Sequence, residues 1–298
     1  MDTSFVRGVI PPIITPVDAD ERVEEQGLRR MVDHVIAGGV HGILSLGSNG
    51  EFFGLEPQEQ QRALAITLDQ AKGRVPVYMG IGAISTRACV KLARMAEQLK
   101  AQAITILPPM FLTPSEEELY RHFRTVAEAT PLPLLLYNNP DRLLVNISAN
   151  LIERLAEVPN IVGVKDSSGD LSLTEEYIRR TRDKGFKVMA GRDLMILGTL
   201  AYGGVGCVAA TANVVPALVV EIYEKFMAGD WHGAREAQFR LAPFRVAFNL
   251  GSFPVVTKDA ANLLGLEVGA PVKPNTSCSE GNQAKLKQIL QDMGALQS

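Results

Sequence analysis

Short apolar runs alternate with longer amphipathic segments along most of the chain. The apolar runs have the length and side-chain types of buried strands, whereas the segments between them have the 3.6-residue period of helices. The predicted strands are Val9–Ile14, Gly42–Leu46, Val75–Ile81, Ala103–Leu107, Leu134–Tyr137, Ile161–Lys165, Lys187–Ala190 and Gly206–Ala209. The predicted helices that separate them are Glu24–Ala37, Pro57–Lys72, Thr86–Leu99, Glu116–Ala129, Ser148–Glu157 and Thr174–Thr181.

Regular alternation of strand and helix is typical of parallel βαβ units with right-handed crossovers. Eight strands can close a barrel, so the pattern predicts a (β/α)8 TIM barrel, with an open doubly wound sheet as the alternative. The segments after the last strand are helical, at Pro216–Met227, Ala234–Asn249, Val255–Leu264 and Asn282–Ile289. We therefore predict a barrel over residues 1–228 and a C-terminal helical extension over residues 229–298, within one compact domain.

Composition and net charge argue against some classes of binding partner. The 298 residues carry a net charge of −3, so no general positive field is available to hold nucleic acid or an anionic membrane surface. No uncharged apolar run reaches the roughly 20 residues that span a bilayer, and the first residues do not resemble a signal peptide. Cys89, Cys207 and Cys278 are widely separated and fit reduced thiols. These features predict a cytoplasmic protein.

Lys165 is the first candidate for chemistry, because it ends an apolar strand and precedes a polar turn. Side chains alternate between the two faces of a strand. We expect the outer helices to cover Val162 and Val164. Ile161, Gly163 and Lys165 then face into the barrel, and Gly163 leaves room for the lysine. Barrel enzymes carry their active sites at this end of the strands. The alternative is a lysine that ends a strand and reaches solvent.

A buried lysine loses the hydration that stabilises its charged form, so we expect a lowered pKa and an accessible neutral amine at Lys165. A neutral amine adds to a ketone and gives first a carbinolamine and then an imine. The protonated imine withdraws electrons from the adjacent carbon, which can then act as an enamine nucleophile. Because the imine itself accepts the electrons, we predict that no metal ion and no organic cofactor is needed.

Tyr137 and a glycine-rich turn complete the candidate site. Tyr137 ends the preceding strand, and by alternation Leu135 and Tyr137 face inward, at the height of Lys165. A phenol can pass protons to and from a carbinolamine. The turn Gly47–Gly50 follows the second strand and can present backbone N–H groups to a carboxylate, and Ser48 can relay protons to Tyr137. The alternative is a tyrosine that caps the core with its hydroxyl in water.

At these residues the sequence resembles the dihydrodipicolinate synthase/N-acetylneuraminate lyase family of class I aldolases. The likeness covers nearly the whole chain, in order and with matching spacing. The segments that carry it are Gly8–Pro16, Gly47–Glu51, Tyr137–Pro140, Gly163–Asp170, Gly203–Gly206, Phe253–Lys258 and Leu263–Leu266. The resemblance implies a (β/α)8 barrel with a helical C-terminal extension, assembled as a homotetramer that is a dimer of dimers.

The resemblance also implies roles for single residues. Lys165 matches the Schiff-base lysine, and Tyr137 matches the proton-transferring tyrosine. Ser48 and Asn49 match turn residues that hold the pyruvate-derived carboxylate. Arg142 matches the arginine that grips the carboxylate of the second substrate in dihydrodipicolinate synthases. The full set of residues expected at the substrate, beside the catalytic Lys165, Tyr137 and Ser48, is Gly47, Asn49, Arg142, Ser167, Gly191 and Val208.

Some positions depart from the family pattern. Phe111 stands where many members have a second tyrosine that they lend to a neighbouring subunit, so the phenol is missing there. Leu143–Leu144 replaces the usual threonine-glycine in the next loop. Asp193 is retained from the sialic-acid lyases, but Leu194 and Ala210 replace polar residues that hold the long sugar chain. These replacements predict a far pocket that is less polar than a sialic-acid site.

The sequence thus predicts a Schiff-base-forming lyase that acts on a small molecule, pyruvate or a related 2-oxo acid. The first hypothesis is aldol cleavage or condensation of a 2-keto-3-deoxy sugar acid or a 4-hydroxy-2-oxo acid. Dihydrodipicolinate (4-hydroxy-tetrahydrodipicolinate) synthase is one alternative. A second is dehydration of a deoxy-keto sugar acid through the same imine, suggested by Leu107–Pro109 and Phe111. A third is a catalytically idle family member that binds a ligand.

Two other patterns are interpreted as structural. Gly204–Ala209 fits the dinucleotide motif G-x-G-x-x-A, but it lies within a predicted strand rather than between a strand and a helix. His34, His41, His122 and His232 lack the paired spacing of metal ligands. We therefore predict neither a nicotinamide cofactor nor a metal site.

Overall fold

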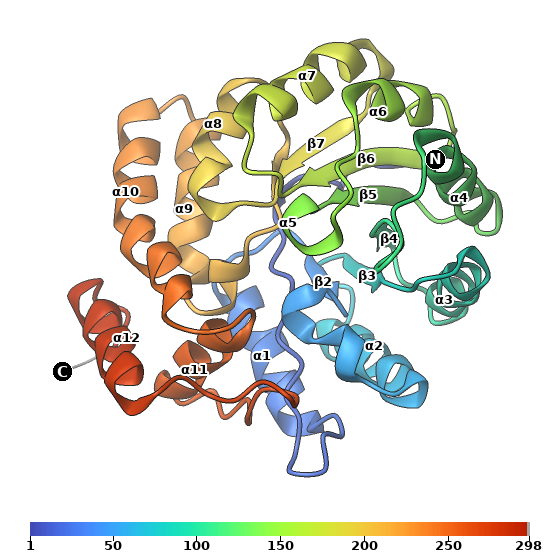
Figure 1. Cartoon of the computed structure of the whole chain (residues 1–298). Helices are drawn as coiled ribbons and strands as arrows, with labels where there is room; N and C mark the ends of the chain where they lie inside the picture. Colours follow the sequence, from blue (N-terminus) through green and yellow to red (C-terminus); the bar gives the residue numbers. More distant parts are fainter. Residues whose placement is uncertain (297–298) are drawn as a thin grey trace.

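The structure is a computed structural model that describes residues 1–296, and these residues form a barrel of parallel strands enclosed by helices (Figure 1). The strands are β1 (Gly8–Val9), β2 (Ile43–Ser45), β3 (Val77–Ile81), β4 (Ala103–Ile106), β5 (Leu134–Asn138), β6 (Ile161–Asp166), β7 (Lys187–Ala190) and β8 (Gly206–Cys207). From β2 to β8 each strand pairs with the next, and β8 pairs with β1. Pro12, just beyond β1, bridges to Leu44 of β2 and closes the ring. The predicted barrel is confirmed, and the open sheet is wrong.

The helices between the strands lie on the outside of the barrel (Figure 1). They are α1 (Glu25–Ala37), α2 (Pro57–Ala71), α3 (Thr86–Gln98), α4 (Glu116–Glu128), α5 (Pro140–Leu143), α6 (Ala149–Leu155), α7 (Leu171–Thr181), α8 (Ile196–Ala201) and α9 (Pro216–Met227). The predicted helices are all present, with ends that shift by a few residues. Helices α5 and α8 were not predicted, because four and six residues are too few to show a helical period.

The acidic residues in the first turn of α4 stabilise the start of this helix. The Ser115 side chain accepts a hydrogen bond from the Glu118 N–H, and the Glu118 carboxylate accepts one from the Ser115 N–H in return. Glu116, Glu117 and Glu118 occupy the first turn, where the positive end of the helix dipole stabilises negative charge. They are therefore helix-start residues.

The C-terminal extension consists of α10 (Trp231–Ala247), α11 (Val255–Leu263) and α12 (Glu280–Asp292). These helices gather on one side of the barrel, beside α1 and α9 (Figure 1). A separate apolar cluster, which includes Val214, Phe244, Val256 and Leu286, packs them together and onto the chain after β8. Within residues 1–296, every helix is too short or too polar to cross a membrane.

Two apolar layers hold the barrel itself together. The outer layer lies between strands and helices, and the inner layer fills the barrel with residues from successive strands. The inner layer includes Ile10, Leu44, Tyr78, Ala103, Leu135, Val162, Met189 and Val208. Each large side chain in such a layer contributes about 1.5–3 kcal/mol through burial. Because this inner layer fills the middle of the barrel, polar side chains find space at the ends of the strands.

Strand β6 departs from regular alternation. Its pairing with β5 shifts, because Leu134 pairs with Ile161 whereas Leu135 pairs with Gly163. A bulge of this kind adds one residue to a strand and turns the neighbouring side chains. Val162 consequently belongs to the inner layer and Ile161 to the outer layer. The predicted faces of these two residues are therefore wrong.

Gly163 is required by the neighbouring strand. A Cβ atom on Gly163 would lie 2.3 Å from the backbone oxygen of Lys187 in β7, so any other residue would push the two strands apart. The prediction that Gly163 makes room for Lys165 is therefore wrong. Beyond the bulge the alternation resumes, with Val164 in the outer layer and Lys165 facing the interior.

Candidate active site

A cavity opens at the C-terminal ends of the strands, and its lining includes Asp141 and Arg142 of α5. Helix α5 lies near the centre of Figure 1. It has a volume of about 90 Å³ and adjoins a hollow of about 390 Å³, with which it shares several lining residues. Most of the residues expected at the substrate line this cavity, namely Lys165, Tyr137, Asn49, Arg142, Ser167, Gly191 and Val208. Gly47 and Ser48 directly precede Asn49 in the turn beside it.

Lys165 and Tyr137 meet inside the cavity. They are direct partners on adjacent strands, β6 and β5. Lys165 is 3% exposed and Tyr137 is 6% exposed. The Lys165 Nζ lies 3.8 Å from the centre of the Tyr137 ring, within the distance of a cation–π contact. An amine and a phenol are thus held side by side and shielded from bulk water.

The Tyr137 hydroxyl is set up to exchange protons. Its oxygen accepts a hydrogen bond from the Asn139 side-chain amide at 2.9 Å. Burial alone would raise the pKa of the phenol. The positive charge of Lys165 and hydrogen bonding by Ser167, Lys165 and Ser48 outweigh burial and hold the pKa of Tyr137 below its usual value of about 10. A phenol with a lowered pKa gives up its proton more readily at neutral pH. Ser48, the predicted relay, therefore lies beside Tyr137.

Hydrogen bonds on the outer side of the barrel fix the ends of β5 and β6. Asn138 and Asp166 follow Tyr137 and Lys165 directly, so they point away from the cavity, and both are buried. The Asn138 amide donates to the Asp166 carboxylate at 3.1 Å, and the Thr174 hydroxyl of α7 donates to it at 2.6 Å. This clamp joins the two strand ends that carry the amine and the phenol.

The turn after β2 forms a short 3-10 helix over Ser48–Gly50. Within it, the Gly50 N–H donates to Gly47 and the Glu51 N–H donates to Ser48. The Ser48 and Asn49 N–H groups come first in this helix and so have no partner inside it. Gly50 must be glycine, because a Cβ atom there would lie 2.9 Å from the backbone oxygen of Ile13. The turn therefore packs tightly against the chain beyond β1.

Gly191 and Ser167 form one wall of the cavity. A Cβ atom on Gly191 would lie 2.1 Å from the Ser167 hydroxyl, so the glycine allows that hydroxyl to stay at the site. The Gly191 N–H donates to the Asp166 backbone oxygen at 2.6 Å, which ties β7 to the end of β6. Val208, from the inner apolar layer, lies at the base of the cavity.

Three arginines surround the outer part of the cavity. Arg142 stacks on Phe253, with its guanidinium carbon 4.7 Å from the ring centre. Arg192, which follows β7, forms an ion pair with Asp141 and donates to the Ser167 backbone oxygen at 2.9 Å. Arg245, from α10 of the extension, forms an ion pair with the buried Asp193 at 3.3 Å. Three guanidinium groups therefore face two carboxylates.

The structure adds charged residues to the far pocket that the sequence did not predict. Ala210 does line the cavity, but Leu194 is 46% exposed and is not among the lining residues. Arg192 and Arg245, which were not predicted, make the outer part of the cavity charged. Arg245 carries no local sequence signal, because it sits in a helix outside the strand ends where site residues were sought.

Phe111 lies outside the cavity. It is 92% exposed and has a left-handed backbone with φ of 69°, in the loop after β4. Phenylalanine rarely adopts this conformation or this exposure. Phe111 therefore takes no part in a proton relay with Tyr137 inside one subunit.

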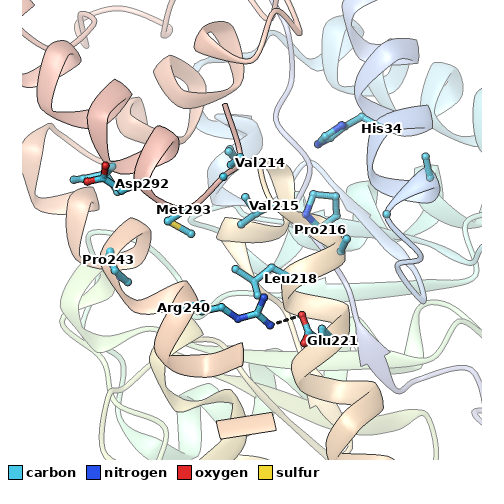
Figure 2. Close-up of a pocket in the computed structure, with 16 residues that line it drawn as sticks. His34, Val214, Val215, Pro216, Leu218, Glu221, Arg240, Pro243, Asp292 and Met293 are labelled. Atoms are coloured by element: carbon cyan, nitrogen blue, oxygen red, sulfur yellow. Dashed lines mark hydrogen bonds and ion pairs between the residues drawn. The ribbon is translucent and has the colours of Figure 1, made fainter. Parts of the chain in front are cut away.

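A groove of about 780 Å³ lies elsewhere, between α1, α9, α10 and α12 (Figure 2). Its walls are largely apolar, with Val214, Leu218 and Met293, and the Arg240–Glu221 ion pair lies along it. Among the described residues that line it there is no lysine, so these residues offer no Schiff-base chemistry. In the described part of the chain, no group of three or more His, Cys, Asp and Glu side chains is arranged to hold a metal ion.

Known proteins resemble this chain over nearly its whole length. A family model described as the dihydrodipicolinate synthetase family matches residues 5–293. The 4-hydroxy-tetrahydrodipicolinate synthase of Methanopyrus kandleri is 38% identical over 98% of this chain and 97% of the relative. The dihydrodipicolinate synthase structure from Thermotoga maritima superposes with a TM-score of 0.95 at 29% identity, covering 97% of this chain and 99% of that one. YagE, a prophage protein of the dihydrodipicolinic acid synthase family from E. coli K12 solved in complex with pyruvate, gives a TM-score of 0.93 at 30% identity, with coverage of 97% and 99%.

Proposed function

Because the chain belongs to the dihydrodipicolinate synthetase family of carbon–carbon lyases, we propose that it forms a Schiff base between Lys165 and pyruvate or a related 2-oxo acid. The imine then makes or breaks the carbon–carbon bond next to the 2-oxo group, in a 2-keto-3-deoxy sugar acid or a 4-hydroxy-2-oxo acid. The observation that carries this proposal is the buried contact between the Lys165 amine and the Tyr137 ring. The pyruvate complex of YagE supports the choice of 2-oxo acid.

The proposed reaction begins when the Lys165 amine adds to the ketone carbon. Tyr137 donates a proton to the carbinolamine oxygen, which leaves as water and gives the protonated imine. In condensation, a base takes a proton from the methyl carbon to give an enamine. This carbon attacks the carbonyl carbon of an aldehyde, the C=O π bond opens, and the aldehyde oxygen takes up a proton to become a hydroxyl group. Water then adds to the new imine and releases the product and the free amine. Cleavage runs through the same steps in reverse.

The arrangement supports a different role for each group of residues around the imine. Asn49 and the N–H groups at the start of the Ser48–Gly50 turn bind the carboxylate, and Ser48 passes protons between Tyr137 and the solvent side. Ser167 and Gly191 hold the opposite wall, and Val208 packs against the imine carbon from below. The outer part of the cavity, with its arginines, receives the rest of the substrate.

Trapping with borohydride tests this proposal directly. Incubation of the protein with pyruvate and borohydride is expected to add one reduced pyruvyl group per chain, detected by intact mass. Incubation with candidate 2-keto-3-deoxy acids then shows the outcome, because pyruvate release marks an aldolase and a product of unchanged chain length marks a dehydratase. Absence of an adduct with pyruvate and with longer 2-oxo acids would refute the Schiff-base proposal.

A second candidate is 4-hydroxy-tetrahydrodipicolinate synthase itself. The names of the relatives support it, since several that are 35–38% identical over nearly the whole chain carry this name. Arg142 supports it too, because a guanidinium at the outer cavity can grip the carboxylate of an amino-acid semialdehyde. A coupled assay with pyruvate and aspartate semialdehyde separates this activity from aldol cleavage of sugar acids.

The charge of the outer cavity predicts an acidic second substrate. Within residues 1–296, Arg142 has no carboxylate at ion-pair distance, so it is available to bind one. We expect Arg142→Met to raise KM for an aldehyde that carries a carboxylate by about 10-fold, the value of one partly exposed charged hydrogen bond. The KM for a neutral aldehyde of similar size should stay unchanged. Steady-state kinetics with the two aldehydes measures the difference.

A matched control keeps this experiment specific. Arg182 lies on the outer surface with a largely exposed side chain, so Arg182→Met should leave both KM values unchanged. The half-saturating pyruvate concentration should also stay the same in Arg142→Met, because Arg142 extends along the adjoining hollow, whose lining does not include Asn49. Equal losses with acidic and neutral aldehydes would contradict the prediction of an acidic substrate.

We further propose a homotetrameric assembly in the cytoplasm. Exposed apolar side chains support an assembly interface, because Phe111 is 92% exposed and Leu144 is 84% exposed, in the loops after the adjacent strands β4 and β5. The free cysteines, Cys89, Cys207 and Cys278, are all buried, which fits a reducing compartment. Sedimentation velocity measures the number of subunits.

A further inference from the structure

A buried ion pair joins the glycine-rich turn to the C-terminal extension. Glu51 ends the turn after β2, and Lys258 lies in α11, 207 residues later. The Lys258 Nζ and a Glu51 carboxylate oxygen are 2.6 Å apart, and each residue is only 1% exposed. The other carboxylate oxygen accepts a hydrogen bond from the Val272 N–H at 2.9 Å. Both oxygens of Glu51 are thus bound by the extension.

Stability alone does not account for this pair. Moving two charges out of water costs free energy that their attraction only partly recovers, so well-packed apolar residues commonly replace such pairs without loss. Burial lowers the pKa of the Lys258 ammonium even though Glu51 favours its charged form. The short contact and its hydrogen bonds join the turn and the extension in one defined arrangement.

The segment that it fixes is the turn at the cavity. Glu51 has a left-handed backbone, with φ of 52°, and it directly follows the Ser48–Gly50 helix. Thr257, the residue before Lys258, donates from its hydroxyl to the Asn49 side-chain oxygen at 3.4 Å. Two consecutive residues of α11 therefore contact two residues of the turn. Asn49 lines the cavity, whereas Glu51 and Lys258 do not.

We propose that the Glu51–Lys258 pair is a positioning device through which the C-terminal extension holds the Ser48–Asn49 turn in place to bind the carboxylate of the 2-oxo acid. This inference rests on the proposed Schiff-base function. Glu51 and Lys258 act through the turn and do not touch the substrate. Loss of the pair therefore weakens binding of the carboxylate while Lys165 and Tyr137 keep their geometry, so half-saturation rises and the rate at saturation is largely retained.

Two variants loosen the pair without changing the net charge of the buried site. Glu51→Gln/Lys258→Met removes both charges and keeps an acceptor for the Val272 N–H. Glu51→Asp keeps both charges but is one methylene too short to reach Lys258 and Val272 together. In both, we expect the pyruvate concentration for half-maximal borohydride trapping to rise about 10-fold, the value of one charged hydrogen bond, with the trapped amount at saturation unchanged.

Asp259 provides a matched control on the same helix. It is buried and its carboxylate accepts from the Cys278 N–H at 2.7 Å, so it holds the extension together without contacting the turn. We expect Asp259→Asn to lower the melting temperature and to leave half-saturation by pyruvate unchanged. A merely structural pair would give the same result in the Glu51 variants.

The outcomes separate the two proposals. If the wild-type protein forms no adduct with any 2-oxo acid, the proposed function fails and this inference fails with it. If the wild-type protein forms the adduct and a folded Glu51→Asp or Glu51→Gln/Lys258→Met protein shows wild-type half-saturation, the positioning role alone is overturned. Raised half-saturation in every one of these variants that folds, with an unchanged value in Asp259→Asn, supports the positioning role.

Discussion

Lys165→Ala is expected to lose the pyruvyl adduct completely and to lower the rate of carbon–carbon bond formation or cleavage by at least roughly four orders of magnitude. Every step of the proposed reaction passes through the bond between the Lys165 amine and the ketone carbon. No other lysine lines the cavity, within residues 1–296, that could replace the amine. The remaining pocket can still bind the substrate, but it cannot withdraw electrons from the reacting carbon.

The fold should survive this substitution. Lys165 is 3% exposed, so its replacement by alanine removes an amine whose burial costs free energy, at the price of a small void beside Tyr137. We therefore expect a melting temperature within a few degrees of wild type. Intact mass after borohydride treatment, together with circular dichroism, separates loss of chemistry from loss of structure.

Two further variants test whether the reaction requires the amine of Lys165 itself. Lys165→Arg keeps a positive charge in the cavity, but a guanidinium stays protonated and does not form an imine, so this variant should be as inactive as Lys165→Ala. Lys91→Ala removes an exposed amine from α3 and should trap pyruvate as the wild type does. An adduct of normal yield on Lys165→Ala would show that another amine carries the chemistry.

The barrel was predictable because its signal is local. Each of β3 to β7 shows a buried apolar run, and each of the longer outer helices shows an amphipathic period, so their positions follow from neighbouring residues. The first and last strands were predicted too long. Gly8 and Gly206 bring the two backbones into close contact, since a Cβ atom on Gly206 would lie 2.1 Å from the Gly8 oxygen, and regular pairing extends over only two residues.

The faces of β6 could not be read correctly from alternation. A bulge leaves no mark in the order of apolar residues, because Ile161 and Val162 are both suited to either side of the sheet. Gly163 is the one residue that hints at it, since glycine within a strand often marks a bulge or a close approach of another backbone. The inward direction of Lys165 was predicted correctly because the irregularity lies before Val164 and alternation resumes there.

The candidate site also combines residues that the sequence could predict with residues that it could not. Lys165, Tyr137 and the Gly47–Gly50 turn follow strands, so the rule that barrel sites lie at strand ends was enough to group them. Arg245 reaches the same cavity from α10, and Lys258 reaches the turn from α11. Contacts between residues some 200 positions apart depend on how the extension folds back, and no periodicity in the sequence records that.

Tyr137→Phe is expected to lower kcat by about 10²- to 10⁴-fold, the usual contribution of a well-placed general acid or base. The phenyl ring keeps its packing in the cavity and its contact with the Lys165 Nζ, so only the hydroxyl is lost. Because Lys165 remains, pyruvate should still form the adduct, but slowly, and long incubation should reach the wild-type yield. Rapid mixing with borohydride at set times measures the rate of adduct formation.

The pH dependence of the rate provides a second test of the role of Tyr137. Burial opposes ionisation of Tyr137, but the charge of Lys165 and the hydrogen bonds from Ser167, Lys165 and Ser48 bring its pKa below the usual value. As pH rises through that lowered pKa, the phenol loses the proton that it must donate to the carbinolamine oxygen, so the wild-type rate should fall. In Tyr137→Phe that fall should be absent. Tyr120→Phe, on the outer helix α4, should keep the wild-type profile. An identical alkaline fall in Tyr137→Phe would assign the proton donor to another group.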